Sequence, residues 1–194
     1  MNYGAISAII TLMFMQVNKI WMMALMLACG ALGVALASQY LLGANPCELC
    51  ILQRYPYVVV MLVSATAIIF TKLKLAKLQI AKSHHEKPQH SKAQYICYIL
   101  VVLAFFATSA IAAYHVGVEQ LWIDAPESCS TKLLQSGSLE QLKASILSAP
   151  KVSCKDVGAS FAGISMASWN MIYGISAIFI IRYLWNKQAK QMTS

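Results

Sequence analysis

Residues 21–42 read WMMALMLACGALGVALASQYLL, a run that contains no charged side chain. A helix needs about 20 consecutive apolar residues to cross the hydrocarbon core of a bilayer, so this run is long enough to span it. The rest of the chain has a similar character, because 59% of its 194 residues are hydrophobic and only 11% are charged. This composition excludes an ordinary soluble domain and predicts an integral membrane protein.

Three further charge-poor stretches follow the first, and each is long enough for a membrane helix. They occupy residues 51–71, 93–114 and 164–185. With the run at residues 21–42, they predict an all-α fold, in which a single membrane domain over residues 1–194 forms a four-helix bundle.

The loops between these spans differ in charge, which predicts the side of the membrane on which each lies. Residues 72–92 contain six lysines and one glutamate, a net charge of +5, whereas residues 115–160 contain four lysines and five acidic residues, a net charge of −1. Because basic residues concentrate in cytoplasmic loops, both termini and the 72–92 loop are expected in the cytoplasm. The loops 43–50 and 115–163 are then outside. The formal charge of +8 is thus a topology signal, and we expect no nucleic-acid partner.

Four cysteines fall in the two predicted outer loops. Cys47 and Cys50 form a Cys-x-x-Cys motif in the short first loop, and Cys129 and Cys154 lie in the long second loop. A pair separated by two residues is more often reactive than stabilising. The sulfur of one cysteine is held close to the sulfur of the other, and the disulfide that they form reopens easily. If the outer face is a periplasm, its oxidising environment lets disulfides persist.

Two other uses of these cysteines remain open on the residues alone. A Cys-x-x-Cys pair also forms half of a zinc site, but zinc takes four ligands, and Cys129 and Cys154 lack the paired spacing of a zinc ribbon or knuckle. We therefore predict no metal ligands. Two inert structural bridges are the other alternative, although a short loop already held by two helices gains little stability from a bridge.

The residues around the motif favour a thiolate at Cys50. Pro46 precedes the motif and an apolar run begins at Ile51, which predicts that Cys50 lies in the opening turn of the second span. Free N–H groups and the helix dipole stabilise negative charge there. Arg54 is four residues further on, so it is expected on the same helix face. Its guanidinium can stabilise the thiolate or donate to the carbonyl of a buried electron acceptor, and the alternative is that it reaches the lipid head groups.

The second outer loop contains a helix signal of its own. Ser138 and Gln141 resemble a capping box, an apolar stripe follows, and Pro150 closes the segment. We expect a short helix that lies flat on the bilayer, with flanks mobile enough to carry electrons between the two cysteine pairs.

Three segments of the chain occur together in a recognisable order. They are SQYLLGANPCELCILQRYPY at residues 38–57, YHVGVEQLW at residues 114–122 and SCKDVGASFAGISMASWN at residues 153–170. Together they resemble the bacterial disulfide-bond formation protein B (DsbB) family over the four-helix body, residues 20–185. The resemblance implies a quinone-dependent thiol oxidase of the bacterial inner membrane. Its expected partner is a periplasmic DsbA-type thioredoxin-fold oxidase, and its expected cofactor is ubiquinone or menaquinone.

The resemblance also implies a role for each outer cysteine. Cys129 receives the partner's thiol as a mixed disulfide, and Cys154 exchanges with Cys47. Cys50 is the thiolate that faces the quinone.

Three polar residues match positions that the family keeps near the quinone: Arg54, His115 and Gln39. For His115 the alternative is an interfacial residue at a helix end. For Gln39 the alternative is a hydrogen bond to a neighbouring helix.

Three rival functions remain beside this one. A vitamin-K-epoxide-reductase-like enzyme is also a small quinone-linked helix bundle, although the order of the segments fits the DsbB family better. A metal-binding or transport protein would hold an ion with the four outer cysteines. A structural membrane subunit would contain two inert bridges.

Overall fold

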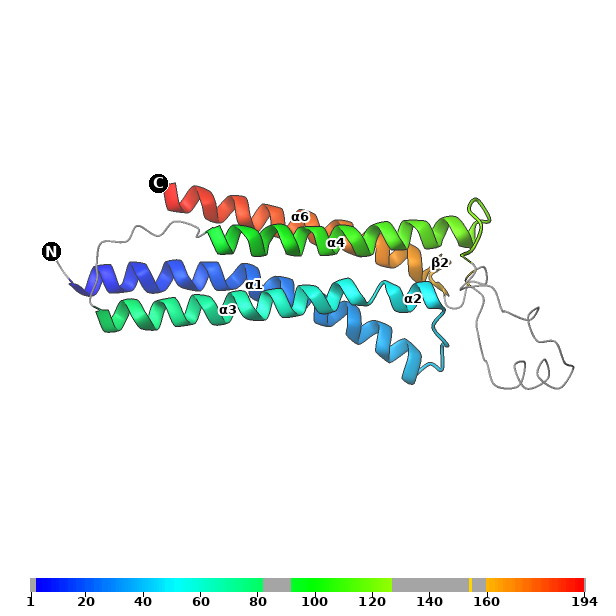
Figure 1. Ribbon diagram of the computed structural model, residues 1–194, viewed down its shortest axis with the longest axis horizontal. Coiled ribbons are helices and arrows are strands. Elements are labelled where there is room, and N and C mark those ends of the chain that lie inside the picture. Colours follow the sequence, from blue (N-terminus) through cyan, green and yellow to red (C-terminus); the bar gives the residue numbers. More distant parts are fainter. Residues whose placement is uncertain (1–2, 82–91, 127–153, 155–159, 194) are drawn as a thin grey trace, which may run out of the picture. The chain divides into compact units, whose positions relative to one another are not determined.

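Helices account for most of the computed structural model, which describes residues 3–81, 92–126, 154 and 160–193 (Figure 1). The elements are α1 (Tyr3–Tyr40), α2 (Glu48–Leu52), α3 (Tyr55–Ala81), α4 (Lys92–Glu119), β1 (Ser160–Phe161), β2 (Ile164–Ser165) and α6 (Met166–Thr193). The prediction of an all-α membrane fold is confirmed. The short helix predicted between Ser138 and Pro150 lies outside the described residues, as does Cys129.

Three stretches of the described helices are long and apolar enough to cross a membrane. They are Asn18–Tyr40, Glu48–Leu73 and Lys92–Glu119. Helix α6 has 28 residues, which is ample length, but it is more polar and contains Asn170 and Arg182. Helix α1 begins well before the predicted run at residue 21, because the apolar segment ahead of it continues the same helix.

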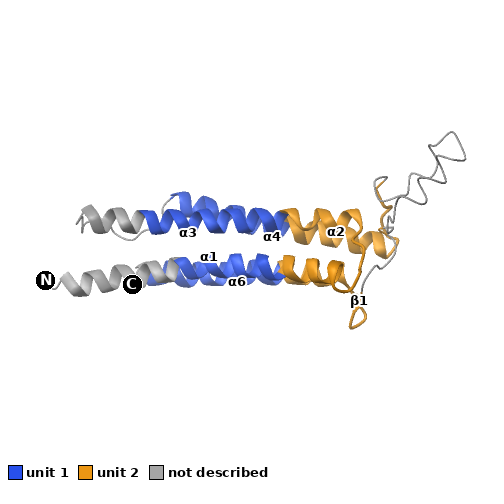
Figure 2. Ribbon diagram, turned by 90° about the horizontal axis from the view of Figure 1, so that it is seen from below, with its two compact units in different colours: residues 1–30, 56–106, 175–194 blue, residues 31–55, 107–174 orange. Residues whose placement is uncertain are grey.

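Contacts divide the chain into two compact units (Figure 2). Unit 1 comprises residues 1–30, 56–106 and 175–194, and unit 2 comprises residues 31–55 and 107–174. The prediction of a single domain over residues 1–194 stays a prediction.

Unit 1 brings segments of α1, α3, α4 and α6 side by side (Figure 2). The buried residues of α3 in this unit recur every three or four positions, which places them on one helical face. They are Tyr57, Val60, Ser64, Ala67 and Thr71. On α1, Ala24 and Ala28 are fully buried. Small residues four apart let neighbouring helices approach closely in a membrane.

The outward faces of these helices are apolar as well. Large exposed hydrophobic side chains in unit 1 include Leu62, Phe70, Leu103, Phe106 and Phe179. A protein surrounded by water rarely exposes so much contiguous apolar surface, whereas lipid-facing helices do. The helix lengths and these faces together describe a multi-pass membrane protein.

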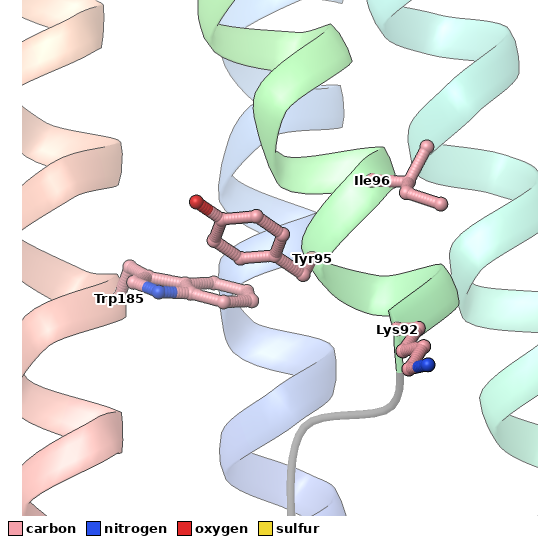
Figure 3. A pocket seen from close by; sticks show the side chains of 4 residues that line it. All are labelled: Lys92, Tyr95, Ile96 and Trp185. Carbon is pink, nitrogen blue, oxygen red and sulfur yellow. The ribbon is translucent and has the colours of Figure 1, made fainter.

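Aromatic side chains gather where α4 begins. The rings of Tyr98 and Trp185 stack with centroids 4.3 Å apart, and Tyr95 lies beside them. Figure 3 shows a pocket here that is lined by Lys92, Tyr95, Ile96 and Trp185. Aromatic and lysine side chains at helix ends are typical of the bilayer interface. None of the candidate site residues lines this pocket.

In unit 2, a tight hairpin leads into α6. Ala162 and Gly163 both have positive φ angles, 55° and 77°, as the two-residue turn between β1 and β2 requires. Ser165 then caps α6, since the backbone N–H of Ser168 donates to its Oγ at 3.2 Å. The cap fixes where α6 starts, and therefore where Asn170 lies in its first turns.

Candidate functional site

The Cys-x-x-Cys motif lies at the start of the short helix α2 (Figure 1). Cys47 is the N-cap residue, and its Sγ accepts a hydrogen bond from the backbone N–H of Cys50 at 3.3 Å. The two Sγ atoms are 3.1 Å apart, and both residues are free thiols. The motif is therefore present as a dithiol whose sulfurs are close enough to form a bond after a small shift.

Helix α4 contributes a histidine to this pair. His115 is only 2% exposed, and its Nε2 lies 3.5 Å from Cys47 Sγ. Its Nδ1 lies 4.0 Å from Cys50 Sγ. Glu119, one turn further along α4, places Oε1 3.7 Å from His115 Nε2. The site thus joins two thiols, one imidazole and one carboxylate in a largely buried space.

These contacts stabilise negative charge on Cys47. Its hydrogen bond with the Cys50 thiol holds the pKa of Cys47 well below the ordinary value of 9.0, with further lowering by His115 and the Cys50 N–H. Burial opposes the effect but does not cancel it. The sequence pattern favoured Cys50 as the thiolate. Helix α2 has only five residues, and its capping acceptor is the Cys47 sulfur, so in the dithiol form the stabilising contacts converge on Cys47.

The lowered pKa of Cys47 predicts a pH dependence of stability in the reduced protein. A group with a depressed folded pKa stabilises the fold above its unfolded pKa and loses that contribution as pH falls through the folded value. We therefore expect the melting temperature of the reduced protein in detergent to fall as pH drops below 9.0. The contribution of Cys47 to this fall is the difference between the wild type and Cys47→Ser. The melting temperature of Cys47→Ser should depend less on pH. Identical profiles would contradict the assignment.

A cysteine from the segment between α4 and β1 lies beside this pair. Cys154 is disulfide-bonded and completely buried. It belongs to one buried cluster with Cys47, Leu49 and Val118, against which Cys50 also packs. A backbone hydrogen bond joins Cys154 to His115. The fold thus brings a cysteine of the second loop to the Cys-x-x-Cys motif.

Arg54 lies in the turn between α2 and α3. Helix α2 ends at Leu52 and α3 begins at Tyr55, so the predicted continuous helix through Cys50 and Arg54 is wrong. The guanidinium turns instead to α1, where Nη1 donates to Gln39 Oε1 at 2.8 Å. Its Nε is buried and has no hydrogen-bond partner among the described residues. An unpaired buried donor of this kind suits the carbonyl oxygen of a bound molecule.

A buried polar network supports the histidine from behind. Gln53 Nε2 lies 3.1 Å from His115 Nδ1, and Asn170 Nδ2 donates to Gln53 Oε1 at 2.8 Å. Asn170 Nδ2 also donates to Thr108 Oγ1 at 3.2 Å, and the Thr108 hydroxyl donates to the backbone carbonyl of Gln53 at 3.0 Å. The network joins the α2–α3 turn, α4 and α6.

The same residues include a candidate metal-binding trio. One ligand atom each from Cys47, Cys50 and His115 lies within 4.8 Å of the others. Two thiolates and an imidazole suit zinc, but a closed structural zinc site takes a fourth protein ligand. Among the described residues, Glu119 is a candidate, because its Oε1 lies 3.7 Å from His115 Nε2.

Comparison with known proteins identifies the family. The profile described as "Disulfide bond formation protein DsbB" matches residues 17–184. The chain belongs to the DsbB family. Membership makes it a membrane disulfide-bond formation protein with disulfide oxidoreductase activity.

Individual relatives agree with the DsbB assignment. The chain is 30% identical over 164 residues to "Disulfide bond formation protein B" of Saccharophagus degradans, which covers 81% of this chain and 87% of the relative. It is 25% identical over 153 residues to the uncharacterized protein RP370 of Rickettsia prowazekii, which covers 78% of this chain and 77% of the relative. No solved structure gives a significant match.

The structure of this DsbB-family chain brings most of the predicted site residues together. Cys47, Cys50, Cys154 and His115 meet in one place, and Arg54 contacts Gln39. The two other cysteines among the described residues are free thiols, on α1 (Cys29) and on α4 (Cys97).

Sequence reasoning missed the polar network of Gln53, Thr108 and Asn170. Gln53 is one residue from Arg54 and is buried although it is polar. A polar side chain inside a predicted span is a signal of function, and Asn170 and Thr108 carry the same signal in theirs. Their mutual contacts are not encoded in any local pattern.

Proposed function

We propose that this chain is a quinone-dependent thiol oxidase that reoxidises a periplasmic DsbA-type thioredoxin-fold oxidase. Electrons pass from the partner's dithiol to Cys129 and Cys154, and from that pair to Cys47 and Cys50. Each exchange reduces one disulfide to two thiols and oxidises another pair, so two electrons and two protons move together. The observation that carries the proposal is the burial of Cys154 in one cluster with the free Cys47 and Cys50 thiols.

The charge distribution at the motif suits the exchange between loops. The partner's thiolate attacks Cys129, which breaks the Cys129–Cys154 bond and frees the Cys154 thiolate. That thiolate attacks the Cys47 sulfur of the oxidised Cys47–Cys50 pair, and the bond to Cys50 breaks. The partner's second thiol then displaces Cys129, and attack of Cys129 on Cys154 releases Cys47 as a thiolate. A thiol with a lower pKa leaves faster, so the contacts that lower the pKa of Cys47 speed this release.

The residues beside the motif fit a quinone. When bound, ubiquinone or menaquinone supplies the two-electron acceptor for oxidation of the Cys47 and Cys50 thiols. Arg54 Nε is the buried donor without a partner among the described residues, and it suits a quinone carbonyl. Gln39 orients the guanidinium through its hydrogen bond to Nη1. We therefore assign Arg54 and Gln39 to the binding of the quinone. His115 is assigned to the thiols, because it contacts the Cys47 sulfur.

The proposed relay needs all four cysteines on one side of the bacterial inner membrane. Both termini and the 72–92 loop are then cytoplasmic, as their basic residues favour. Labelling of intact cells with a membrane-impermeant maleimide tests this arrangement. Asn45 is exposed just before the motif, so Asn45→Cys is expected to take up more label than the wild type in intact cells. A gain of label only after the cytosol is opened would contradict the topology.

The direct test of the relay is quinone absorbance. Purified protein in detergent, mixed with quinone and an excess of a reduced thioredoxin-fold oxidase, should consume one quinone per partner dithiol over many turnovers. No loss of quinone absorbance, or a single turnover only, would contradict the proposal.

Arg54→Lys tests the assignment of Arg54 to the quinone. Lysine keeps the charge but lacks both Nε and the planar fork, so one hydrogen bond of about 1 kcal/mol is lost. We expect the apparent KM for quinone to rise about fivefold, with a smaller change in kcat. Arg182→Lys, an exposed arginine on α6, is the matched control and should leave KM unchanged. An unchanged KM in Arg54→Lys would return Arg54 to a role at the lipid head groups.

A metal-binding function is a second candidate, because the Cys47, Cys50 and His115 ligand atoms lie within 4.8 Å of one another. Elemental analysis of the purified reduced protein separates the two functions. Stoichiometric zinc that survives dialysis and blocks quinone reduction would favour the metal site. We expect none.

A further inference from the structure

The buried network behind the motif has a defined direction of hydrogen bonding. The backbone carbonyl of Gln53 can only accept, so the Thr108 hydroxyl must give its proton to it. Thr108 Oγ1 is then left as an acceptor, and it takes a proton from Asn170 Nδ2. The second Nδ2 proton of Asn170 goes to Gln53 Oε1. A backbone group thus fixes the orientation of both side-chain amides.

The orientation of the Gln53 amide determines which ring nitrogen of His115 carries the proton. With Oε1 committed to Asn170, Gln53 presents Nε2 to His115 Nδ1 at 3.1 Å. An amide nitrogen is a donor only, so Nδ1 must accept. In the neutral ring the proton is then on Nε2, which faces Cys47 Sγ at 3.5 Å and Glu119 Oε1 at 3.7 Å. Both of these atoms accept, and the backbone of Cys154 also hydrogen-bonds to the ring.

We propose that Gln53 and Asn170 are positioning residues that hold the neutral His115 ring in the tautomer with its proton on Nε2. In that tautomer the ring donates to the Cys47 sulfur. The opposite tautomer would point a lone pair at the same sulfur. Gln53 is 6% exposed, His115 2% and Thr108 0%, so water does not compete for these hydrogen bonds. We assign this tautomer a role in releasing Cys47 as a thiolate, and that role rests on the proposed function.

Two substitutions should reverse the tautomer by different routes. In Asn170→Asp the carboxylate only accepts, so the Gln53 amide turns its Nε2 to Asp and its Oε1 to His115. In Gln53→Glu the carboxylate itself faces His115 as an acceptor. Both variants therefore require a proton on Nδ1. Asn45→Asp, an exposed residue just before the motif, adds the same charge outside the network and is the matched control.

The test is nitrogen-15 NMR of histidine-labelled protein in detergent, at an alkaline pH where the ring is neutral. The chain has four histidines, so the His115 signals are assigned by their loss in His115→Gln. We expect Nδ1 to be unprotonated in the wild type and in Asn45→Asp, and protonated in Asn170→Asp and Gln53→Glu. A protonated Nδ1 in the wild type overturns the proposal. So does an unprotonated Nδ1 in whichever of the two network variants folds.

A redox equilibrium tests what the tautomer does. A stabilised Cys47 thiolate stabilises the dithiol, so its loss should favour the disulfide. In equilibrium with dithiothreitol at the same pH, Asn170→Asp should shift the Cys47/Cys50 pair about tenfold toward the disulfide, which is about 30 mV. Alkylation followed by mass spectrometry measures the fractions of the Cys47/Cys50 pair in the dithiol and disulfide forms. An unchanged equilibrium in a variant whose Nδ1 is protonated would overturn the link to Cys47.

Neither readout uses a quinone or a protein partner, so the two proposals fail separately. If the wild type consumes no quinone, the proposed function fails and the tautomer assignment stands. If the wild type consumes quinone but its Nδ1 is protonated, the tautomer assignment fails alone.

Discussion

Cys50→Ser should reduce quinone reduction to the uncatalysed background, and Cys47→Ser should do the same. Oxidation of a dithiol needs two sulfurs that can form one bond, and the two Sγ atoms lie 3.1 Å apart in the reduced protein. Neither thiol has a substitute close by, because Cys154 is already disulfide-bonded. Quinone absorbance with dithiothreitol as the electron donor measures the effect.

Cys129→Ser and Cys154→Ser should behave differently. Each should block oxidation of the thioredoxin-fold partner but leave quinone reduction by the small dithiol largely intact, because that donor can reach the first pair directly. Cys29→Ser and Cys97→Ser are the matched controls, since both cysteines are free thiols outside the motif, and both variants should keep full turnover. Normal quinone turnover in Cys50→Ser would end the proposal.

His115→Phe should slow disulfide exchange at Cys47 about ten- to hundredfold. A hydrogen bond to a charged group contributes about 1.5–3 kcal/mol, and each 1.4 kcal/mol is a factor of about ten in rate. Without the imidazole the pKa of Cys47 should rise toward 9.0, because the Nε2 contact at 3.5 Å is lost. The pH dependence of Cys47 alkylation, read by mass spectrometry, gives both the pKa and the rate.

Tyr114→Phe is the control for this prediction. Tyr114 is the neighbour of His115 on α4 but donates to the carbonyl of Asp124 and does not contact the thiols. Its removal should leave the alkylation profile of Cys47 unchanged. If the profile is also unchanged in His115→Phe, the histidine has no part in stabilising the thiolate.

The membrane class and the helices were predictable from local sequence. Residues 93–114 were predicted as a span, and α4 covers Lys92–Glu119. This agreement has a simple cause, because a bilayer requires a long apolar run and each run is contiguous in the chain. Cys47 and Cys50 were also readable as site candidates from the motif, and His115 from the resemblance of its segment to the DsbB family.

The break after α2 was not predictable in the same way. An apolar run from Ile51 fits one continuous helix, yet α2 ends at Leu52 and α3 begins at Tyr55. The turn between them directs Arg54 to Gln39 and Gln53 to His115. Hydropathy does not register such a turn, because its benefit lies in contacts with distant helices.

The sequence by itself determined that this protein is helical, lies in a membrane and carries a Cys-x-x-Cys pair, because each of these properties follows from residues that are neighbours in the chain. Only the tertiary structure decided that hydrogen bonds converge on the Cys47 sulfur, that Cys154 lies beside it, and that Gln53 links His115 to Asn170. The hydrogen bond between Gln53 and Asn170 spans a sequence separation of 117 residues. Contacts of that range depend on how helices pack, and packing leaves no periodic trace in the residues that make them.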